Sequence, residues 1–205
     1  MRLSKDNHEE YITMMEGRIT KLENILLEIN GYVRNSKQKP VFSIFSLDEM
    51  VRNVWSDLKF MEQAQQVSVE IKIDKHIHLN SDPDKWKMII SNLISNSIKY
   101  HDLKRSEPYL RIRAEITYDH LELSFEDNGQ GVSKEHQDKI FDMFYRANEA
   151  STGSGLGLFL VKKMLDRLGG SISIESELGQ GTKVKIKTPS SLNHALITPE
   201  PISSS

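Results

Sequence analysis

The stretch Ala150–Gly169, ASTGSGLGLFLVKKMLDRLG, runs from a glycine-rich segment into a helical pattern without a break. Gly153, Gly155 and Gly157 have no Cβ, so backbone amides at these positions can approach a ligand closely. The helix that follows directs its N-terminal end, with its unpaired N–H groups and partial positive charge, at the same place. We therefore interpret the stretch as an anion site, most consistent with phosphates. The glycines alone leave a plain flexible loop open as the alternative.

Composition limits the kinds of protein that this chain can be. Its 205 residues suit one domain with an appendage, and 38% hydrophobic residues are enough for a core. The formal net charge of −2 gives no reason to expect nucleic acid or an anionic membrane as a partner. The absence of cysteine excludes disulfides, zinc thiolates and cysteine nucleophiles. No apolar run has the length of a membrane span, so we expect a cytoplasmic chain without membrane contact.

The first 36 residues predict one long helix. Apolar residues recur in steps of three and four, which is a heptad seam, at Ile12, Met15, Ile19, Leu22, Leu26, Ile29 and Val33. A single helix cannot bury its own apolar stripe, so the seam needs a partner. Packing on the following domain is one possibility. We favour a dimer or bundle, because the seam persists for more than three heptads.

The rest of the chain predicts a linker over 37–45, a domain over 46–189 and a Ser- and Pro-rich disordered tail over 190–205. The domain pattern alternates helices and strands. Ser46 and Glu49 form a capping box that opens a helix reaching about residue 66, and Asp82 and Pro83 open another that reaches about residue 100. Strands are predicted at 67–73, 77–79, 110–118, 121–126, 171–175 and 182–188, and short helices at 133–139 and around the Phe141-x-x-Phe144 pair.

Polar and glycine residues gather at the edges of these elements. Asn92 and Asn96 lie four apart on one face of the helix 82–100, beside its apolar stripe, although Asn is a mediocre helix former. The sequence Asp127-Asn-Gly-Gln-Gly131 follows a strand. Each feature taken singly has a structural explanation, such as capping by the asparagines or a turn at the glycines.

Taken in order, these motifs resemble the ATP-binding domain of sensor histidine kinases. That domain is a branch of the superfamily shared with gyrase, the large heat-shock chaperone and mismatch-repair ATPases. The resemblance covers about residues 45–189 and rests on five ordered motifs, which are Asn92-Leu-Ile-Ser-Asn96-Ser-Ile-Lys99-Tyr100, Asp127-Asn-Gly129-Gln-Gly131, Phe141-Asp-Met-Phe144, Gly153-Ser-Gly155-Leu-Gly157-Leu158 and Gly179-Gln-Gly181-Thr182. It implies an α+β fold, a two-layer α/β sandwich of the Bergerat type whose mixed, mostly antiparallel sheet is covered on one face by helices.

The resemblance also implies a role for each motif. Asp127 would accept a hydrogen bond from the adenine amino group, supported by Thr182, while Gly131 lets the backbone pass close to the ring. Asn96 would coordinate Mg²⁺, with Asn92 one turn earlier and directed towards the metal or the phosphates. The implied nucleotide-binding set is Asn92, Asn96, Lys99, Tyr100, Asp127, Gly129, Gly131, Phe141, Phe144, Arg146, Gly153, Ser154, Gly155, Leu156, Gly157, Leu158 and Thr182, with Asn92 and Lys99 also taking part in catalysis. Residues 146–153 would form a mobile lid.

The same resemblance gives the expected partners. The N-terminal helix resembles the second helix of the dimerisation hairpin, which implies a homodimer, and the full-length protein would engage a response-regulator receiver domain. The family's phosphoacceptor box is absent, because His8 is followed by Glu-Glu-Tyr-Ile without a proline. We therefore expect a fragment of a longer kinase that binds Mg-ATP, presents its γ-phosphate to a histidine elsewhere and does not autophosphorylate.

Two alternatives remain at this point. An ATP hydrolase of the same superfamily would need a general base, and the superfamily places Glu where this chain has Asn92, whose amide cannot take a proton. A degenerate dimerisation module without nucleotide is the other alternative. Intact Asp127, Asn96 and the three glycines of the second glycine motif count against it.

Overall fold

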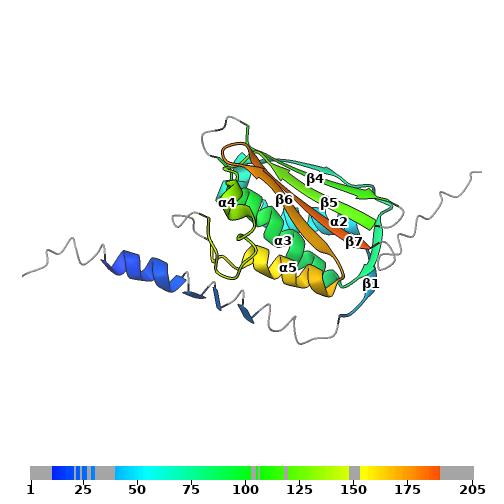
Figure 1. Cartoon of the computed structure of the whole chain (residues 1–205), viewed down its shortest axis with the longest axis horizontal. Coiled ribbons are helices and arrows are strands. Elements are labelled where there is room, and N and C mark those ends of the chain that lie inside the picture. The colour runs from blue at the N-terminus through cyan, green and yellow to red at the C-terminus, as the bar shows by residue number, and fades with distance from the viewer. Residues whose placement is uncertain are drawn as a thin grey trace, which may run out of the picture.

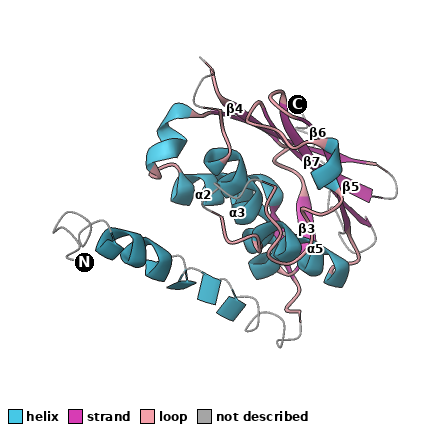
Figure 2. Cartoon of the chain, turned by 60° about the vertical axis from the view of Figure 1, so that its left-hand side comes forward, coloured by secondary structure: helices cyan, strands magenta, loops and turns pink. Residues whose placement is uncertain are grey.

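The computed structural model describes residues 11–20, 22, 23, 25, 26, 29, 30, 40–102, 105, 107–117, 120–147 and 153–189. The domain has two layers, with a sheet on one side and the helices α2 (Leu47–Leu58), α3 (Pro83–Lys99) and α5 (Gly157–Arg167) on the other (Figure 1). Figure 2 shows the same three helices packed side by side. This arrangement is the predicted α+β sandwich.

The main sheet has five strands in the order β2-β4-β5-β7-β6. Only the β2–β4 pair is parallel, so the sheet is mixed and mostly antiparallel, as predicted. The pairing of β5 with β7 sets Asp127 opposite Thr182. A separate two-stranded sheet pairs β1 with β3. The strand bounds are β1 Ser43–Ser46, β2 Ser68–Lys72, β3 His78–Ser81, β4 Tyr109–Ile116, β5 His120–Asp127, β6 Ser171–Glu177 and β7 Gly181–Pro189.

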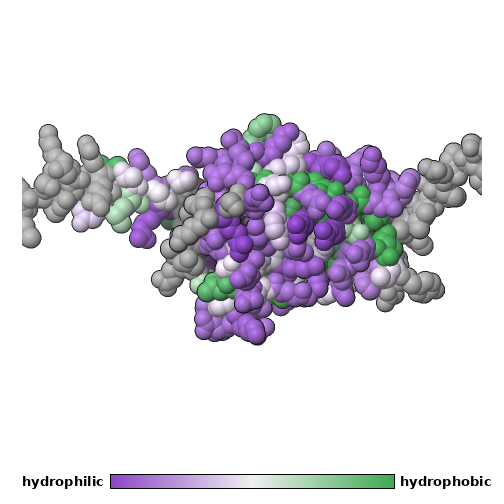
Figure 3. All heavy atoms as spheres, turned by 90° about the horizontal axis from the view of Figure 1, so that it is seen from above, coloured by the Kyte–Doolittle hydropathy of each residue, from purple (hydrophilic) through white to green (hydrophobic). Residues whose placement is uncertain are grey.

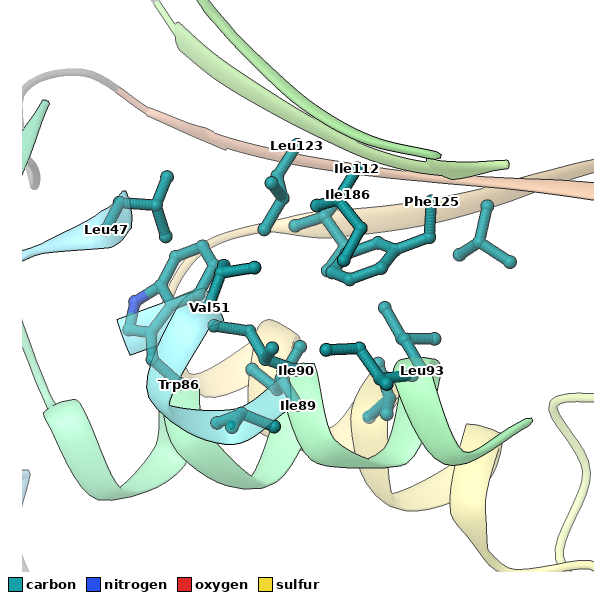
Figure 4. Packing of buried hydrophobic residues seen from close by; sticks show 14 of the residues in the cluster. Leu47, Val51, Trp86, Ile89, Ile90, Leu93, Ile112, Leu123, Phe125 and Ile186 are labelled. Atoms are coloured by element: carbon teal, nitrogen blue, oxygen red, sulfur yellow. The ribbon is translucent and has the colours of Figure 1, made fainter. Parts of the chain in front are cut away.

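The core lies between the sheet and the helices. Alternating residues of β4, β5 and β7, such as Ile112, Phe125 and Ile186, point from the sheet towards α2 and α3 (Figure 4). Trp86 on α3 is fully buried, and its indole N–H donates to Ser81 Oγ at 3.0 Å. Each large side chain buried in this way contributes about 1.5–3 kcal/mol, so the apolar face of α3 fixes that helix firmly against the sheet.

The opposite face of the sheet is charged. Glu126 on β5 is paired across the strands with Arg111 and with Lys183, both at 3.4 Å, and Glu122 is paired with Lys187 at 3.2 Å. Figure 3, which looks down on the sheet side, shows mainly hydrophilic atoms. Within the described ranges, no helix combines the length and apolar character needed to cross a membrane.

Two predicted helices are shorter in the structure and a third is absent. The helix predicted over 46–66 ends at Leu58, because Met61 takes up extended backbone (ψ 136°) and only a 3₁₀ turn, Glu62–Gln66, follows. This turn brings Ala64 into the core. The helix around Phe141 and Phe144 was also wrong. Helix α4 spans only Lys134–Gln137, residues 138–144 form turns, and the positive φ of Phe144 (65°) is incompatible with a right-handed helix.

The described N-terminal residues are helical, but their apolar seam is not buried. Ile12, Met15, Ile19, Leu22 and Leu26 are each between 53% and 62% exposed. Of the residues described between 11 and 30, only Ile25 and the seam residue Ile29 are half-buried against the core of the domain. Val33 of the seam and the predicted disordered tail over 190–205 lie outside the described residues.

Candidate functional site

A cavity of about 180 Å³ lies between the C-terminal half of α3, the ends of β5 and β7, and the chain that leads into α5. Its floor is apolar and its rim is polar. The lining residues are Asn92, Leu93, Asn96, Ser97, Lys99, Tyr100, Phe125, Asp127, Gly131, Val132, Ile140, Tyr145, Arg146, Ala147, Gly153, Ser154, Gly155, Gly157, Leu158, Ile174, Thr182 and Val184.

The carboxylate of Asp127 is held by three separate elements. Its Oδ1 accepts the Gly129 N–H at 2.9 Å and the Thr182 N–H at 3.3 Å, and its Oδ2 accepts from Ser97 Oγ at 3.0 Å. Burial raises the pKa of this carboxyl above its ordinary value, and these three hydrogen bonds oppose the shift without cancelling it. The result is a fixed acceptor at the inner end of the cavity. Among the described lining residues it is the only carboxylate.

The two asparagines meet the first residue of α5. Asn92 donates its amide to the Met88 carbonyl at 2.9 Å, so its oxygen is turned away from its own helix. A Cβ on Gly157 would lie 2.9 Å from that oxygen and 3.9 Å from the Asn96 amide nitrogen. Because α3 rises 1.5 Å per residue, Asn92 is displaced from Ser97 by about 7.5 Å along the helix axis. The Asn92 end and the Asp127 end are therefore two distinct parts of one cavity, and Asn96 lies between them along α3.

The remaining wall depends on backbone conformation. Gly155 has φ +76°, and a Cβ there would lie 2.7 Å from the carbonyl carbon of Phe144. The Phe144 N–H donates to the Gly155 carbonyl at 3.0 Å, which ties the two ends of this segment together. Tyr145 then enters the cavity wall, and its hydroxyl lies 2.7 Å from His136 Nδ1. Residues 148–152 of the predicted lid lie outside the described residues.

Comparison with known proteins shows which family the chain belongs to. The family described as histidine kinase-, DNA gyrase B- and HSP90-like ATPases matches residues 81–192, which is more than half of the chain. The chain belongs to this family. The match begins at the last residue of β3 and includes α3, the Asp127 loop and the glycine-rich start of α5, so it contains every described residue of the cavity lining.

The chain is also similar to bacterial sensor proteins. Sensor protein SrrB of Staphylococcus aureus (strain NCTC 8325 / PS 47) is 32% identical over 187 residues, which cover 84% of this chain and 30% of SrrB. The chain thus spans less than a third of the length of the curated relatives that it matches.

Two solved structures have the same fold. Full-length ShkA in complex with AMPPNP has a TM-score of 0.71 and 18% identity, over 92% of this chain and 40% of ShkA. Histidine kinase ThkA in complex with response regulator TrrA has a TM-score of 0.68 and 23% identity, over 92% of this chain and 53% of ThkA.

Within this family fold, most of the predicted site residues line the cavity, and four do not. Leu156 is fully buried in the core, and Phe144 is 52% exposed on the outside. Phe141 lies under the Lys162 ammonium, 5.6 Å from its ring centre. Gly129 is packed against the Tyr100 carbonyl, 2.4 Å from where a Cβ would stand. The structure gives these four residues supporting positions around the cavity.

Several lining residues were missed by sequence reasoning. Ser97 could have been found, because it sits in the same motif as Asn96, two residues before the end of α3. The apolar floor carried no such signal, since a buried apolar residue on a helix, strand or turn looks the same in sequence whether it faces a cavity or a solid core. It consists of Leu93, Phe125, Val132, Ile140, Ala147, Ile174 and Val184.

Proposed function

We propose that this chain is the ATP-binding catalytic module of a sensor histidine kinase, which holds Mg-ATP and presents the γ-phosphate to a histidine of another segment. The observation that carries the proposal is that Asp127, both asparagines and the glycine-rich start of α5 share one cavity. Family membership and the similarity to SrrB support the same assignment.

The inner end of the cavity suits the base. The apolar floor offers the faces of Leu93, Phe125 and Ile174 to a flat ring, and Asp127 offers an acceptor to an exocyclic amino group. Each carboxylate oxygen has two lone pairs, so Oδ2 keeps one after accepting from Ser97. A buried, charge-assisted bond of this kind selects an amino group over a carbonyl, and therefore adenine over a base with oxygen at that position.

The outer end suits the phosphates. The N-terminus of α5, whose first residue is Gly157, directs unpaired N–H groups and partial positive charge into the cavity, and Lys99 adds a full charge at its rim. Asn96 would supply an amide oxygen to Mg²⁺, a hard cation that prefers oxygen ligands. Bound Mg²⁺ would neutralise phosphate charge, while Asn92, Asn96 and Lys99 orient the phosphates.

Transfer to a histidine is favoured over hydrolysis. Asn92 stands at the phosphate end, and its amide, which donates to the Met88 carbonyl, cannot accept a proton from water. Asp127 is the only described carboxylate of the lining, and it lies at the other end of the cavity. Phosphoryl transfer needs mainly positioning and charge neutralisation, which these residues provide without a base.

The decisive experiment measures Mg-ATP affinity of Asp127→Asn by calorimetry. The substitution removes the charge-assisted acceptor, so we expect affinity to fall about 10- to 100-fold, since such a bond contributes about 1.5–3 kcal/mol. Asp138→Asn is the control, because Asp138 is exposed and outside the cavity. Equal affinities for wild type and Asp127→Asn, or no ATP binding by wild type, would contradict the proposal.

We further propose that the full-length kinase engages a receiver domain, as ThkA engages TrrA.

We also propose that the exposed seam of the N-terminal helix forms a homodimer. More than half of each seam side chain from Ile12 to Leu26 is open to solvent, which a lone helix would not favour. Ile19→Glu should convert a dimer to a monomer in light scattering, whereas Arg18→Glu, off the seam, should not. A monomeric wild type would refute the dimer.

A further inference from the structure

His136 and Tyr145 connect helix α4 to the wall of the cavity. The Tyr145 hydroxyl lies 2.7 Å from His136 Nδ1, and the two rings are 6.0 Å apart between centres, tilted by 53°. Tyr145 lines the cavity and His136 does not. The histidine therefore stands behind a wall residue and makes no direct contact with the space in front of it.

The charges around His136 define the direction of this hydrogen bond. Its other nitrogen, Nε2, lies 3.6 Å from the Glu135 carboxylate, which favours a hydrogen on Nε2. In the neutral ring Nδ1 is then an acceptor, so the Tyr145 hydroxyl donates to it. A donor and an acceptor matched in this way fix the orientation of both rings.

Tyr145 lies in an irregular part of the wall. Tyr145 belongs to no helix or strand, and its N–H reaches the Asp142 carbonyl at a long 3.2 Å. Its neighbour Phe144 is tied to Gly155, on the far side of residues 148–152, which the described residues do not include. By contrast, His136 is anchored in α4, where its carbonyl accepts the N–H groups of Lys139 and Ile140 at 3.0 Å.

We propose that His136 is a positioning residue for the nucleotide site. By holding the Tyr145 hydroxyl it fixes the wall formed by Tyr145, Arg146 and Ala147, and so sets the width of the cavity. This inference rests on the proposed nucleotide binding. It adds a residue that never touches the ligand and that lies outside every motif on which the family resemblance was built.

The test is a double-mutant cycle on Mg-ATP affinity. Tyr145→Phe removes only the hydroxyl, while His136→Leu removes its partner together with the exposed Glu135 contact, and each should weaken binding about threefold to tenfold. The double variant should be no weaker than either single one, because both remove the same bond. His76→Leu is the control, since His76 is exposed and distant in sequence. Additive losses, or unchanged affinity in Tyr145→Phe, would overturn the proposal.

A conservative variant separates positioning from general damage. Asn can place an amide group close to the position of Nδ1, so His136→Asn should recover most of the affinity that His136→Leu loses. A loss in His136→Asn equal to that in His136→Leu would overturn the proposal.

Nitrogen NMR provides a readout that needs no nucleotide. The His136 Nδ1 resonance should shift in Tyr145→Phe, and an unchanged resonance would show that the bond is absent in solution. If Asp127→Asn binds Mg-ATP more weakly than wild type, but the cycle shows no coupling, only the positioning role fails. If wild type does not bind at all, the proposed function fails with it.

Discussion

The cavity has two walls that are built in different ways. The α3 wall, made of Asn92 and Asn96 on α3 with Asp127 on β5 and Thr182 on β7, consists of side chains on elements that also carry fully buried core residues. The loop wall, residues 144–147 and 153–157, depends on backbone conformations, including φ +65° at Phe144 and φ +76° at Gly155. In the first wall tertiary packing determines where the functional groups lie, and in the second local geometry does.

This difference has an energetic consequence. A helix fixed by a buried face is rigid before any ligand arrives, so its groups need no reordering on binding. A loop wall with few buried contacts opens at a lower free-energy cost than the core. Substitutions that act on α3 should therefore lower the stability of the whole domain, while those in the loop wall should act more locally.

The largest effect on the free energy of unfolding is expected at the buried ion pair that anchors α3. Lys85 and Asp82 are 3% and 6% exposed, and Asp82 also caps α3 and accepts the Val41 N–H at 3.3 Å. Lys85→Met leaves the Asp82 carboxylate buried without its cation, so the free energy of unfolding should fall by about 3–5 kcal/mol in urea titration. Lys87→Met breaks an ion pair whose members are both more than half exposed, and should cost less than about 1 kcal/mol. Similar losses in both variants would show that α3 is not anchored by the buried pair.

An intermediate effect is expected in the loop wall at Gly155. Alanine there must adopt φ +76° and would clash with the backbone of Phe144 and Tyr145. Gly155→Ala should lower the free energy of unfolding by about 1–3 kcal/mol. Gly17→Ala, in the N-terminal helix with no atom within 4 Å of the new Cβ, should cost nothing. An undiminished unfolding free energy in Gly155→Ala would mean that the loop wall is free to rearrange.

A smaller effect, on binding alone, is expected where the two walls meet. The Cβ of Gly157→Ala would press on the Asn92 side-chain oxygen, which can swing away at little cost to the fold. Moving that amide off its preferred rotamer costs about 0.5–1.5 kcal/mol, so Mg-ATP affinity should fall about twofold to tenfold with the melting temperature unchanged. Unaltered affinity would show that Asn92 takes no part in holding the ligand.

Sequence reasoning predicted the α3 wall better than the loop wall. The apolar periodicity and the Asp82 cap located α3 to within a residue, and a helix placed there carries Asn92 and Asn96 on one face without further information. The same reasoning failed at Phe144. Its positive φ is stabilised by contact with Gly155, eleven residues later, and no local pattern encodes that contact.

The strands show the same limit. The alternation of apolar and polar residues predicted which residues of β4, β5 and β7 face inward. It could not distinguish Phe125 and Val184, which face the cavity, from Ile112 and Leu123, which face a filled core. That distinction depends on where α3 ends and where the chain before α5 passes. Both are consequences of long-range packing, which the sequence of a single strand does not contain.

The smallest effect is expected on the melting temperature of the nucleotide-free Asp127→Asn variant. The same substitution that weakens Mg-ATP binding should raise the stability of the protein without nucleotide. Burial raises the pKa of Asp127, so the folded state favours its protonated form. The stability that this carboxyl contributes is complete below the ordinary Asp pKa and is lost as pH rises through the raised folded value. Near neutral pH the charged group therefore destabilises the empty fold, whereas Asn keeps the hydrogen bonds to Gly129, Thr182 and Ser97 without a charge. Asp127→Asn should melt above wild type at pH 7, and the difference should shrink towards pH 4. A melting temperature of Asp127→Asn below that of wild type at pH 7 would contradict this prediction. It would mean that the buried charge of Asp127 does not destabilise the nucleotide-free fold.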